Sequence, residues 1–207
     1  MSRVLDSEKG IDIEIAPGFL VLCDMDGTLI DTDYANYLSY RRAIADIMLQ
    51  TQELEFNSGK RLNRVGLRER LPRLTDDQYN KIISLKTEYY SEYLPETRVN
   101  TTLADFIRKC SGTYETVLVT CCRERRARET MQYHNILECF SRLICWEALT
   151  ASGLSNKYTN ALNLLGANPT TTIVCENGTI DIERAILAGV PRENIISVRR
   201  HDRRAML

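Results

Sequence analysis

Hydrophobic residues form short continuous runs in the first and last parts of the chain, and these runs alternate with segments of helical periodicity. The apolar runs predict buried strands over residues 19–23, 116–119, 142–145, 171–175 and 194–198. Isoleucines that alternate with acidic residues predict one further short strand over residues 11–15. Helices are predicted over residues 102–110, 124–133, 158–165 and 181–188. Strands that alternate with helices form a parallel sheet, so we expect an α/β fold with a Rossmann-like, doubly wound parallel sheet.

The middle of the chain, residues 33–100, has a different pattern. One helical face is marked by Ala43, Ile44, Ile47 and Met48. A second helix is predicted from Thr75 to Pro95, and a basic connection that contains glycine occupies residues 57–73. We therefore expect an α/β core of residues 1–32 and 101–207, with residues 33–100 inserted as a helical cap domain.

Composition narrows the class of protein. The chain has 207 residues, of which 43% are hydrophobic and 27% charged, as is typical of a soluble globular protein. Its net charge of −1 does not favour binding to nucleic acid or to an anionic membrane. No apolar stretch is long enough to span a membrane and the N-terminus lacks a signal-peptide core, so we expect a cytoplasmic protein. The seven cysteines show no CxxC spacing, which indicates free thiols.

Two aspartates stand directly after the most apolar strand. Asp24 and Asp26 follow residues 19–23, and Gly27 permits a sharp turn after them. Ligands bind beyond the carboxyl ends of the strands in open α/β sheets. Two close carboxylates repel each other, so a hard cation such as Mg²⁺ is expected to neutralise them. The alternative is a surface turn in which two acids merely end a strand.

Further polar residues follow the other predicted strands. Thr120 ends the strand at 116–119 and could bind a phosphoryl oxygen. Glu176 ends the strand at 171–175, and Asp181 follows, so both could complete a Mg²⁺ site. Lys157, at the start of a helix, could hold a phosphate as a point charge. Each residue also has a simpler interpretation as a cap, an exposed lysine or a loop acid, but their order along the chain favours one shared site.

These motifs resemble those of the haloacid dehalogenase superfamily, in its phosphatase and phosphoglucomutase-like branch. The first motif is Asp24-Met-Asp26-Gly-Thr28-Leu-Ile-Asp31, and Val117-Leu-Val-Thr120 resembles the second. Lys157 resembles the third motif, and Glu176-Asn-Gly-Thr-Ile-Asp181 resembles the fourth. The resemblance covers about residues 18–200.

The resemblance implies a role for each matching residue. Asp24 would be the nucleophile that forms an aspartyl-phosphate, and Asp26 would be the general acid and then the base. Thr120 and Lys157 would hold the transferring phosphoryl group. Mg²⁺ would be bound by Asp24, by the Asp26 backbone carbonyl and by the fourth-motif acids. Because dehalogenases of this superfamily lack an acid at the position of Asp26, its presence favours phosphoryl transfer.

The chain departs from the family pattern at three places. Cys121 stands where such proteins often have Asn or Ser, and Asn177 replaces a commoner acid. The segment around Lys157 lacks the Lys-Pro-x-Pro pattern of many relatives. The amide of Asn177 can still coordinate a metal, but one negative charge is lost, so Mg²⁺ would depend more on Glu176 and Asp181.

The sequence therefore favours a Mg²⁺-dependent phosphatase that acts on a small phosphorylated metabolite. Candidate substrate contacts are Gly27, Thr28 and Cys121, with Arg68 from the predicted cap. Arg68 belongs to a basic cluster with Lys60, Arg61 and Arg64, which is either a solvated face or a clamp for phosphate or carboxylate. Two alternatives stay open, a sugar phosphomutase and a non-catalytic binding or regulatory module. The sequence does not indicate the oligomeric state.

Overall fold

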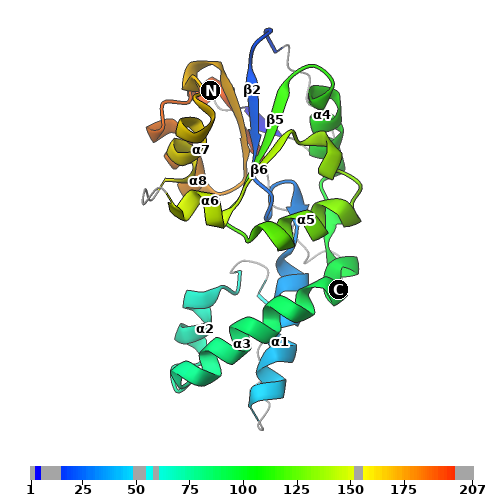
Figure 1. Cartoon of the computed structure of the whole chain (residues 1–207), viewed down its shortest axis with the longest axis vertical. Helices are drawn as coiled ribbons and strands as arrows, with labels where there is room; N and C mark the ends of the chain where they lie inside the picture. The colour runs from blue at the N-terminus through cyan, green and yellow to red at the C-terminus, as the bar shows by residue number, and fades with distance from the viewer. Residues whose placement is uncertain (1–2, 6–14, 49–54, 58–60, 152–155, 199–207) are drawn as a thin grey trace. The chain divides into compact units, whose positions relative to one another are not determined.

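The computed structural model describes residues 3–5, 15–48, 55–57, 61–151 and 156–198 (Figure 1). The chain divides into two compact units, one of residues 1–30 and 99–200 and the other of residues 31–98 and 201–207. We call them the α/β unit and the helical unit, and describe each by itself. Most of the strand predicted over residues 11–15 lies outside the described residues.

The α/β unit contains a sheet of six parallel strands in the order β1-β8-β7-β2-β5-β6. The strands are β1 (Arg3–Leu5), β2 (Leu20–Cys23), β5 (Glu115–Val119), β6 (Arg142–Ile144), β7 (Thr172–Glu176) and β8 (Ile195–Val198). The predicted parallel α/β fold is confirmed. Strand β2 lies between β7 and β5, so the residues that follow it are at the centre of the sheet edge.

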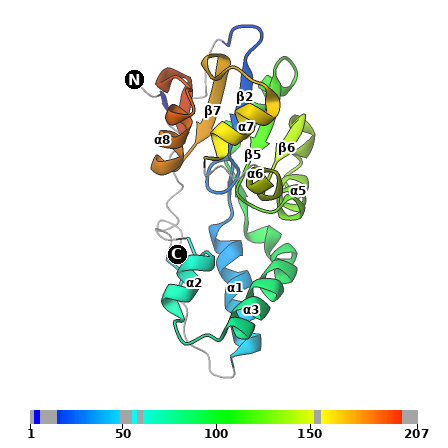
Figure 2. The ribbon, with the colours of Figure 1, turned by 60° about the vertical axis from the view of Figure 1, so that its left-hand side comes forward.

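Helices cover both faces of this sheet (Figures 1 and 2). On one side lie α4 (Thr101–Ser111) and α5 (Glu124–Tyr133). On the other lie α6 (Trp146–Ala151), α7 (Lys157–Leu165) and α8 (Thr179–Leu187). Short 3₁₀ segments are η2 (Leu137–Cys139), η3 (Pro169–Thr171) and η4 (Arg192–Asn194). Helix α6 was not predicted, and at six residues it is too short for a helical period to be recognised.

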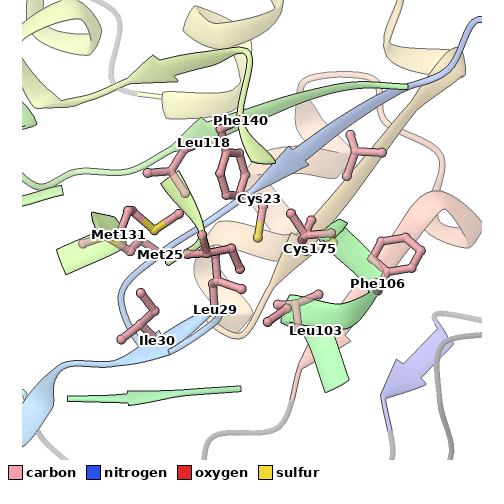
Figure 3. Packing of buried hydrophobic residues seen from close by; sticks show 14 of the residues in the cluster. Cys23, Met25, Leu29, Ile30, Leu103, Phe106, Leu118, Met131, Phe140 and Cys175 are labelled. Carbon is pink, nitrogen blue, oxygen red and sulfur yellow. The ribbon is translucent and has the colours of Figure 1, made fainter. Parts of the chain in front are cut away.

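The core follows from the two-residue period of the strands. Val21 and Cys23 of β2 pack with α4 and α5 on one face, whereas Leu20 and Leu22 pack with α7 and α8 on the other. Figure 3 shows Cys23 packed in the first of these clusters. Because both faces are buried, β2 is continuously apolar rather than alternating.

The helical unit contains α1 (Asp33–Ile47), α2 (Arg64–Arg70), α3 (Asp76–Tyr89) and the 3₁₀ segment η1 (Tyr90–Glu96). Helix α3 begins with a capping box in which Thr75 accepts from the backbone of Gln78. Buried residues of the three helices, among them Ile44, Leu67 and Ile82, form one core.

The prediction of a plain connection over residues 57–73 is wrong, because α2 lies within it. This helix has seven residues and begins at an Asn63 cap, so it has little helical periodicity to detect. The helix predicted to run to Pro95 ends at Tyr89 and continues as η1.

Three further features complete the fold. The boundary between the units falls within β3 (Ile30–Asp31) and β4 (Arg98–Val99), which pair as a two-stranded sheet. All seven cysteines are free, as predicted. Among the described residues, no helix has both the length and the apolar character that crossing a bilayer requires.

Candidate active site

The central strands of the α/β unit deliver polar residues to one edge of the sheet. Asp24 follows β2, and its backbone N–H donates to the Cys175 carbonyl of β7 at 3.0 Å. Thr120 follows β5, and its N–H donates to Ile144 of β6 at 3.0 Å. Glu176 is the last residue of β7. The parallel ladder therefore sets the spacing of these residues through the backbone.

Lys157 lies at the centre of the acidic residues. Its Nζ is 2.8 Å from Asp24 Oδ1, 2.8 Å from Glu176 Oε2 and 3.5 Å from Asp181 Oδ2. The side chain is buried, with 5% exposed. Burial lowers the pKa of Lys157, but the three carboxylates outweigh burial and raise that pKa well above its usual range. The lysine is therefore a permanent buried cation.

The start of α7 fixes this lysine in place. Lys157 is the first residue of the helix, and the Asn156 side chain caps it by accepting from the Tyr158 N–H at 3.0 Å. The Asn156 amide also donates to the Arg184 carbonyl at 2.8 Å, which ties α7 to α8. At the other end, Gly166 closes the helix at a φ of 61°.

Glu176 is held by the chain's own donors on both oxygens. Its Oε1 accepts from the backbone N–H groups of Asn177 at 2.9 Å and Gly178 at 3.0 Å. Its Oε2 accepts from the Tyr158 hydroxyl at 2.6 Å, in addition to the contact with Lys157. Sequence reasoning missed Tyr158, because a tyrosine on the apolar face of a predicted helix is also what a core position contains. The structure makes it both a core residue and a hydrogen-bond donor.

Asp24 carries an unfavourable charge. Burial, followed by the charge of Glu176, raises its pKa from 3.8 to about 7, although Lys157 acts in the opposite direction. One lysine thus does not fully offset the acids around it. An additional cation would stabilise the charged form of Asp24.

Three acceptor oxygens converge on the hydroxyl of Thr28. Its Oγ is 2.9 Å from Asp24 Oδ2, 3.1 Å from Asn177 Oδ1 and 3.5 Å from Glu176 Oε1. One hydroxyl donates one hydrogen, so at most one of these oxygens receives it fully. Clustered carboxylate and amide oxygens are suitable ligands for a hard cation, and the donor set therefore fits Mg²⁺.

The predicted metal ligands do not gather as a purely acidic cluster. Within the described part of the chain, no three His, Cys, Asp or Glu side chains form a group that could hold a metal ion. Asp181 lies between two cations, 3.5 Å from Lys157 Nζ and 2.9 Å from Arg184 Nη1. The oxygens that converge include the amide of Asn177, so the replacement of an acid at this position leaves an oxygen ligand in place.

The turn after β2 fixes the backbone of the aspartate pair. Gly27 has a φ of 84°, in the left-handed region that favours glycine, and its N–H donates to the Ile30 carbonyl at 2.8 Å. The Met25 carbonyl accepts from the N–H groups of Leu29 at 3.1 Å and Ile30 at 3.0 Å. This tight turn separates the two acids, and the Asp26 side chain forms an ion pair with Arg126 of α5. The prediction of site residues did not include Arg126.

Thr120 is fully buried, and its hydroxyl accepts from the Cys122 N–H at 3.3 Å. This bond orients the hydroxyl, which keeps its own proton to donate to an anion. Cys121, the next residue, is exposed. Partial shielding raises the pKa of Cys121, whereas Lys157 lowers it, which places the thiol near the buried lysine.

Arg68, which was predicted to contact the substrate, lies in α2 of the helical unit. Its guanidinium pairs with Asp76 at 2.6 Å and lies 4.1 Å from the centre of the Tyr79 ring. Arg61 likewise pairs with Asp33 at 2.5 Å. Both cations pair with carboxylates of the helical unit, Arg68 on its exposed surface and Arg61 in a largely buried pair. Lys60 lies outside the described residues, and a substrate contact of Arg68 stays a prediction.

Comparisons with known proteins agree with this geometry. The model of the family described as haloacid dehalogenase-like hydrolase matches residues 21–194. A HAD-superfamily hydrolase of subfamily IA, variant 1, from Geobacter sulfurreducens has a similar structure, with 17% identity and a TM-score of 0.62 over 89% of this chain and 90% of that one. Curated protein sequences gave no match.

Two other solved structures carry more specific names. A predicted phosphoglycolate phosphatase from Haemophilus somnus 129PT is 18% identical, with a TM-score of 0.66 over 86% of this chain and 84% of that one. A beta-phosphoglucomutase from Clostridium difficile is 14% identical, with a TM-score of 0.61 over 83% of this chain and 81% of that one. At these identities the likeness shows the fold, while the match to the family model covers most of the chain.

Proposed function

We propose that this chain, which belongs to the family of haloacid dehalogenase-like hydrolases, is a Mg²⁺-dependent phosphatase that hydrolyses a small phosphomonoester through an aspartyl-phosphate. The observation that carries the proposal is the buried ion pair between Asp24 and Lys157 at the carboxyl ends of β2 and β7. A carboxylate nucleophile and a fixed cation lie there within 2.8 Å. Together they can attack and bind the same phosphoryl group.

In the first half of the reaction, an oxygen of Asp24 attacks phosphorus while the bond from phosphorus to the leaving oxygen breaks. Asp26 gives its proton to that leaving oxygen. Lys157 and the Thr120 hydroxyl neutralise and orient the phosphoryl oxygens. In the second half, Asp26 takes a proton from water, which attacks the aspartyl-phosphate and releases inorganic phosphate. The protons balance, because Asp26 loses one in the first half and regains one in the second.

Magnesium, when bound, would supply positive charge that offsets the negative charge of Asp24 and of the phosphoryl oxygens. The residues that would hold it are Asp24, Glu176 and Asn177, whose oxygens surround the Thr28 hydroxyl. The family resemblance adds the Asp26 backbone carbonyl. Asp181 acts through Lys157: it contacts the ammonium group of that lysine, as Glu176 does, and helps to hold it in place.

The presence of Asp26 favours phosphoryl transfer over dehalogenation. A halide needs no proton to leave, whereas the oxygen of a phosphomonoester does. The acid two residues after the nucleophile has no task in a dehalogenase, but it is required for the release of an alcohol.

The test is turnover of 4-nitrophenyl phosphate with Mg²⁺ and with excess EDTA. We expect turnover that requires Mg²⁺ and is lost in Asp24→Asn. Asp105→Asn is the matched control, because Asp105 is an exposed acid of α4 that pairs with Arg108 one helical turn away. No turnover by the wild type with any divalent metal, or full turnover by Asp24→Asn, would overturn the proposal.

A sugar phosphomutase is the alternative that the same site could serve. It would return the phosphoryl group from Asp24 to a sugar rather than to water. Adding a glucose bisphosphate to an assay with a glucose phosphate separates the two functions. A phosphatase releases inorganic phosphate without the activator, whereas a mutase isomerises the sugar phosphate only when the bisphosphate is present.

A further inference from the structure

Arg126 links helix α5 to the turn that carries the proton-transferring acid. Its Nη2 forms an ion pair with Asp26 Oδ2, across 100 positions of sequence. Both side chains are mostly shielded, with 14% of Arg126 and 19% of Asp26 exposed. The pair therefore lies within the α/β unit rather than on its open surface.

We propose that Arg126 is a positioning residue that holds the Asp26 carboxyl group in the orientation needed to give its proton to the leaving oxygen and then, as the carboxylate, to take a proton from water. The proposal rests on the proposed function, since it assigns to Arg126 a part in the proton transfer of that same reaction.

The backbone of Asp26 is already fixed by the turn, so only its side chain can still move. The Gly27 and Ile30 hydrogen bonds fix the turn on both sides of it. The carboxylate can still rotate about its side-chain bonds, and a misplacement of about 1 Å costs on the order of 100-fold in rate. A guanidinium, with a planar fork of donors, restrains such a carboxylate better than a lysine does.

The rotation of α5 is set by the core, and this aims Arg126 at the turn. Ala127 and Met131 are fully buried against the sheet, so the helix cannot turn about its axis. The Thr130 hydroxyl donates to the Arg126 carbonyl at 2.7 Å and braces the backbone there.

The neighbouring arginines of the same helix behave differently. Arg125 pairs with Glu129 at 2.8 Å, and Arg128 pairs with Glu124 at 2.7 Å, both one helical turn away on the exposed surface. Arg126, in contrast, forms an ion pair with a residue outside the helix. Arg128 thus provides a matched control of the same residue type on the same element.

The arrangement separates the two aspartates by giving each its own cation. Asp24 pairs with Lys157 of α7, and Asp26 pairs with Arg126 of α5, on the opposite side of the sheet. The nucleophile and the proton-transferring acid are therefore held independently. Loss of Arg126 should impair proton transfer without removing the nucleophile or its cation.

The readout is the dependence of rate on the leaving group. Nitrophenolate leaves without a proton, whereas phenolate and alkoxides need one, so only the latter depend on a well-placed Asp26. Wild type, Arg126→Gln, Arg126→Lys and Arg128→Gln are compared on 4-nitrophenyl, 4-chlorophenyl and phenyl phosphates. The parameter is kcat/KM, which reports the first bond cleavage.

We expect Arg126→Gln to lower kcat/KM for phenyl phosphate about 10- to 100-fold and for 4-nitrophenyl phosphate less than about threefold. Arg126→Lys should show the same trend with a smaller loss, and Arg128→Gln should match the wild type. In an Asp26→Asn background, Arg126→Gln should add no further loss, because both changes remove the same step.

Equal losses across all three substrates would overturn the inference, because they indicate general damage to the site. Additive losses in the Asp26→Asn background would overturn it as well. If Arg126→Gln does not fold, as judged by circular dichroism, Arg126→Lys carries the same comparison. A wild type that turns over none of the substrates overturns the proposed function and this inference together, whereas uniform losses in an active enzyme overturn the inference alone.

Discussion

Asp24→Asn should stabilise the metal-free protein while it abolishes catalysis. Asp24 is buried, and its pKa rises from 3.8 to about 7 even though Lys157 lies beside it. Its charged form is thus disfavoured in the folded state. Asparagine has nearly the same shape as the protonated acid and carries no charge, so the substitution removes this cost.

The size of the effect follows from the pKa shift. A shift of one pKa unit corresponds to about 1.4 kcal/mol, so a rise of about 3 units gives an upper bound of about 4 kcal/mol. The loss of a counterion for Lys157 acts in the opposite direction. We therefore expect a gain of about 1–4 kcal/mol in the free energy of unfolding at pH 8.

The direction of the pKa shift of Asp24 determines how the stability gained by Asp24→Asn depends on pH. Because the pKa of Asp24 is higher in the folded than in the unfolded state, its favourable contribution is fully present below about pH 4 and is lost as the pH rises to about 7. The advantage of Asp24→Asn should be close to zero at pH 3.5, grow through pH 5 and 6, and level off above pH 7.

The assay is urea unfolding in EDTA at pH 4, 6 and 8, followed by circular dichroism. Asp105→Asn serves as the control and should change stability by less than about 1 kcal/mol at every pH, because its ion pair is exposed. Mg²⁺ should stabilise the wild type more than Asp24→Asn, since binding to the folded state adds stability. A variant that is less stable than the wild type at pH 8, or a difference that does not change with pH, would refute the reasoning.

Three further substitutions test the site. Lys157→Met should destabilise the protein by about 3–5 kcal/mol in urea, because it leaves Asp24 and Glu176 buried without their cation; a loss below 1 kcal/mol would contradict a buried pair. Gly27→Ala should cost about 1–2 kcal/mol and reduce turnover, because its φ of 84° is strained for an L-residue; an unchanged midpoint would show that the turn relaxes. Tyr158→Phe should lower the free energy of unfolding by about 1–3 kcal/mol, because the buried Glu176 loses a donor at 2.6 Å. A Mg²⁺ titration followed by thermal unfolding should also show weaker Mg²⁺ binding. Unchanged binding would place Glu176 outside the metal site.

Much of the fold was predictable from local patterns. The predicted helix over 124–133 coincides with α5. The predicted strand at 19–23 begins one residue before β2, and the predicted strand at 171–175 is shifted by one residue from β7. Buried strands and amphipathic helices in an α/β unit repeat a period that is visible in the sequence. Helices α2 and α6 were not predicted, because six or seven residues hold too few turns to show a period.

The site was predictable only in part. The Asp24–Asp26 motif and the ends of the strands indicated which acids to consider, since parallel strands bring their carboxyl ends to one edge. Sequence reasoning also indicated Lys157, through its position in the family motifs. Arg68 was predicted from its place in a basic cluster, and in the structure it pairs with Asp76, so its contact with a substrate stays a prediction.

The sequence by itself determined the order of strands and helices, the turn at Gly27 and the identity of the acids, because each is encoded by neighbouring residues. Only the tertiary structure decided which partners those acids have. Arg126 is one of several arginines on α5, and nothing local distinguishes it from Arg128. What distinguishes it is the rotation of the helix, which is set by how Ala127 and Met131 pack against the sheet. That rotation depends on residues distant in sequence, so the pairing of Asp26 with Arg126 emerges only when the whole core is assembled.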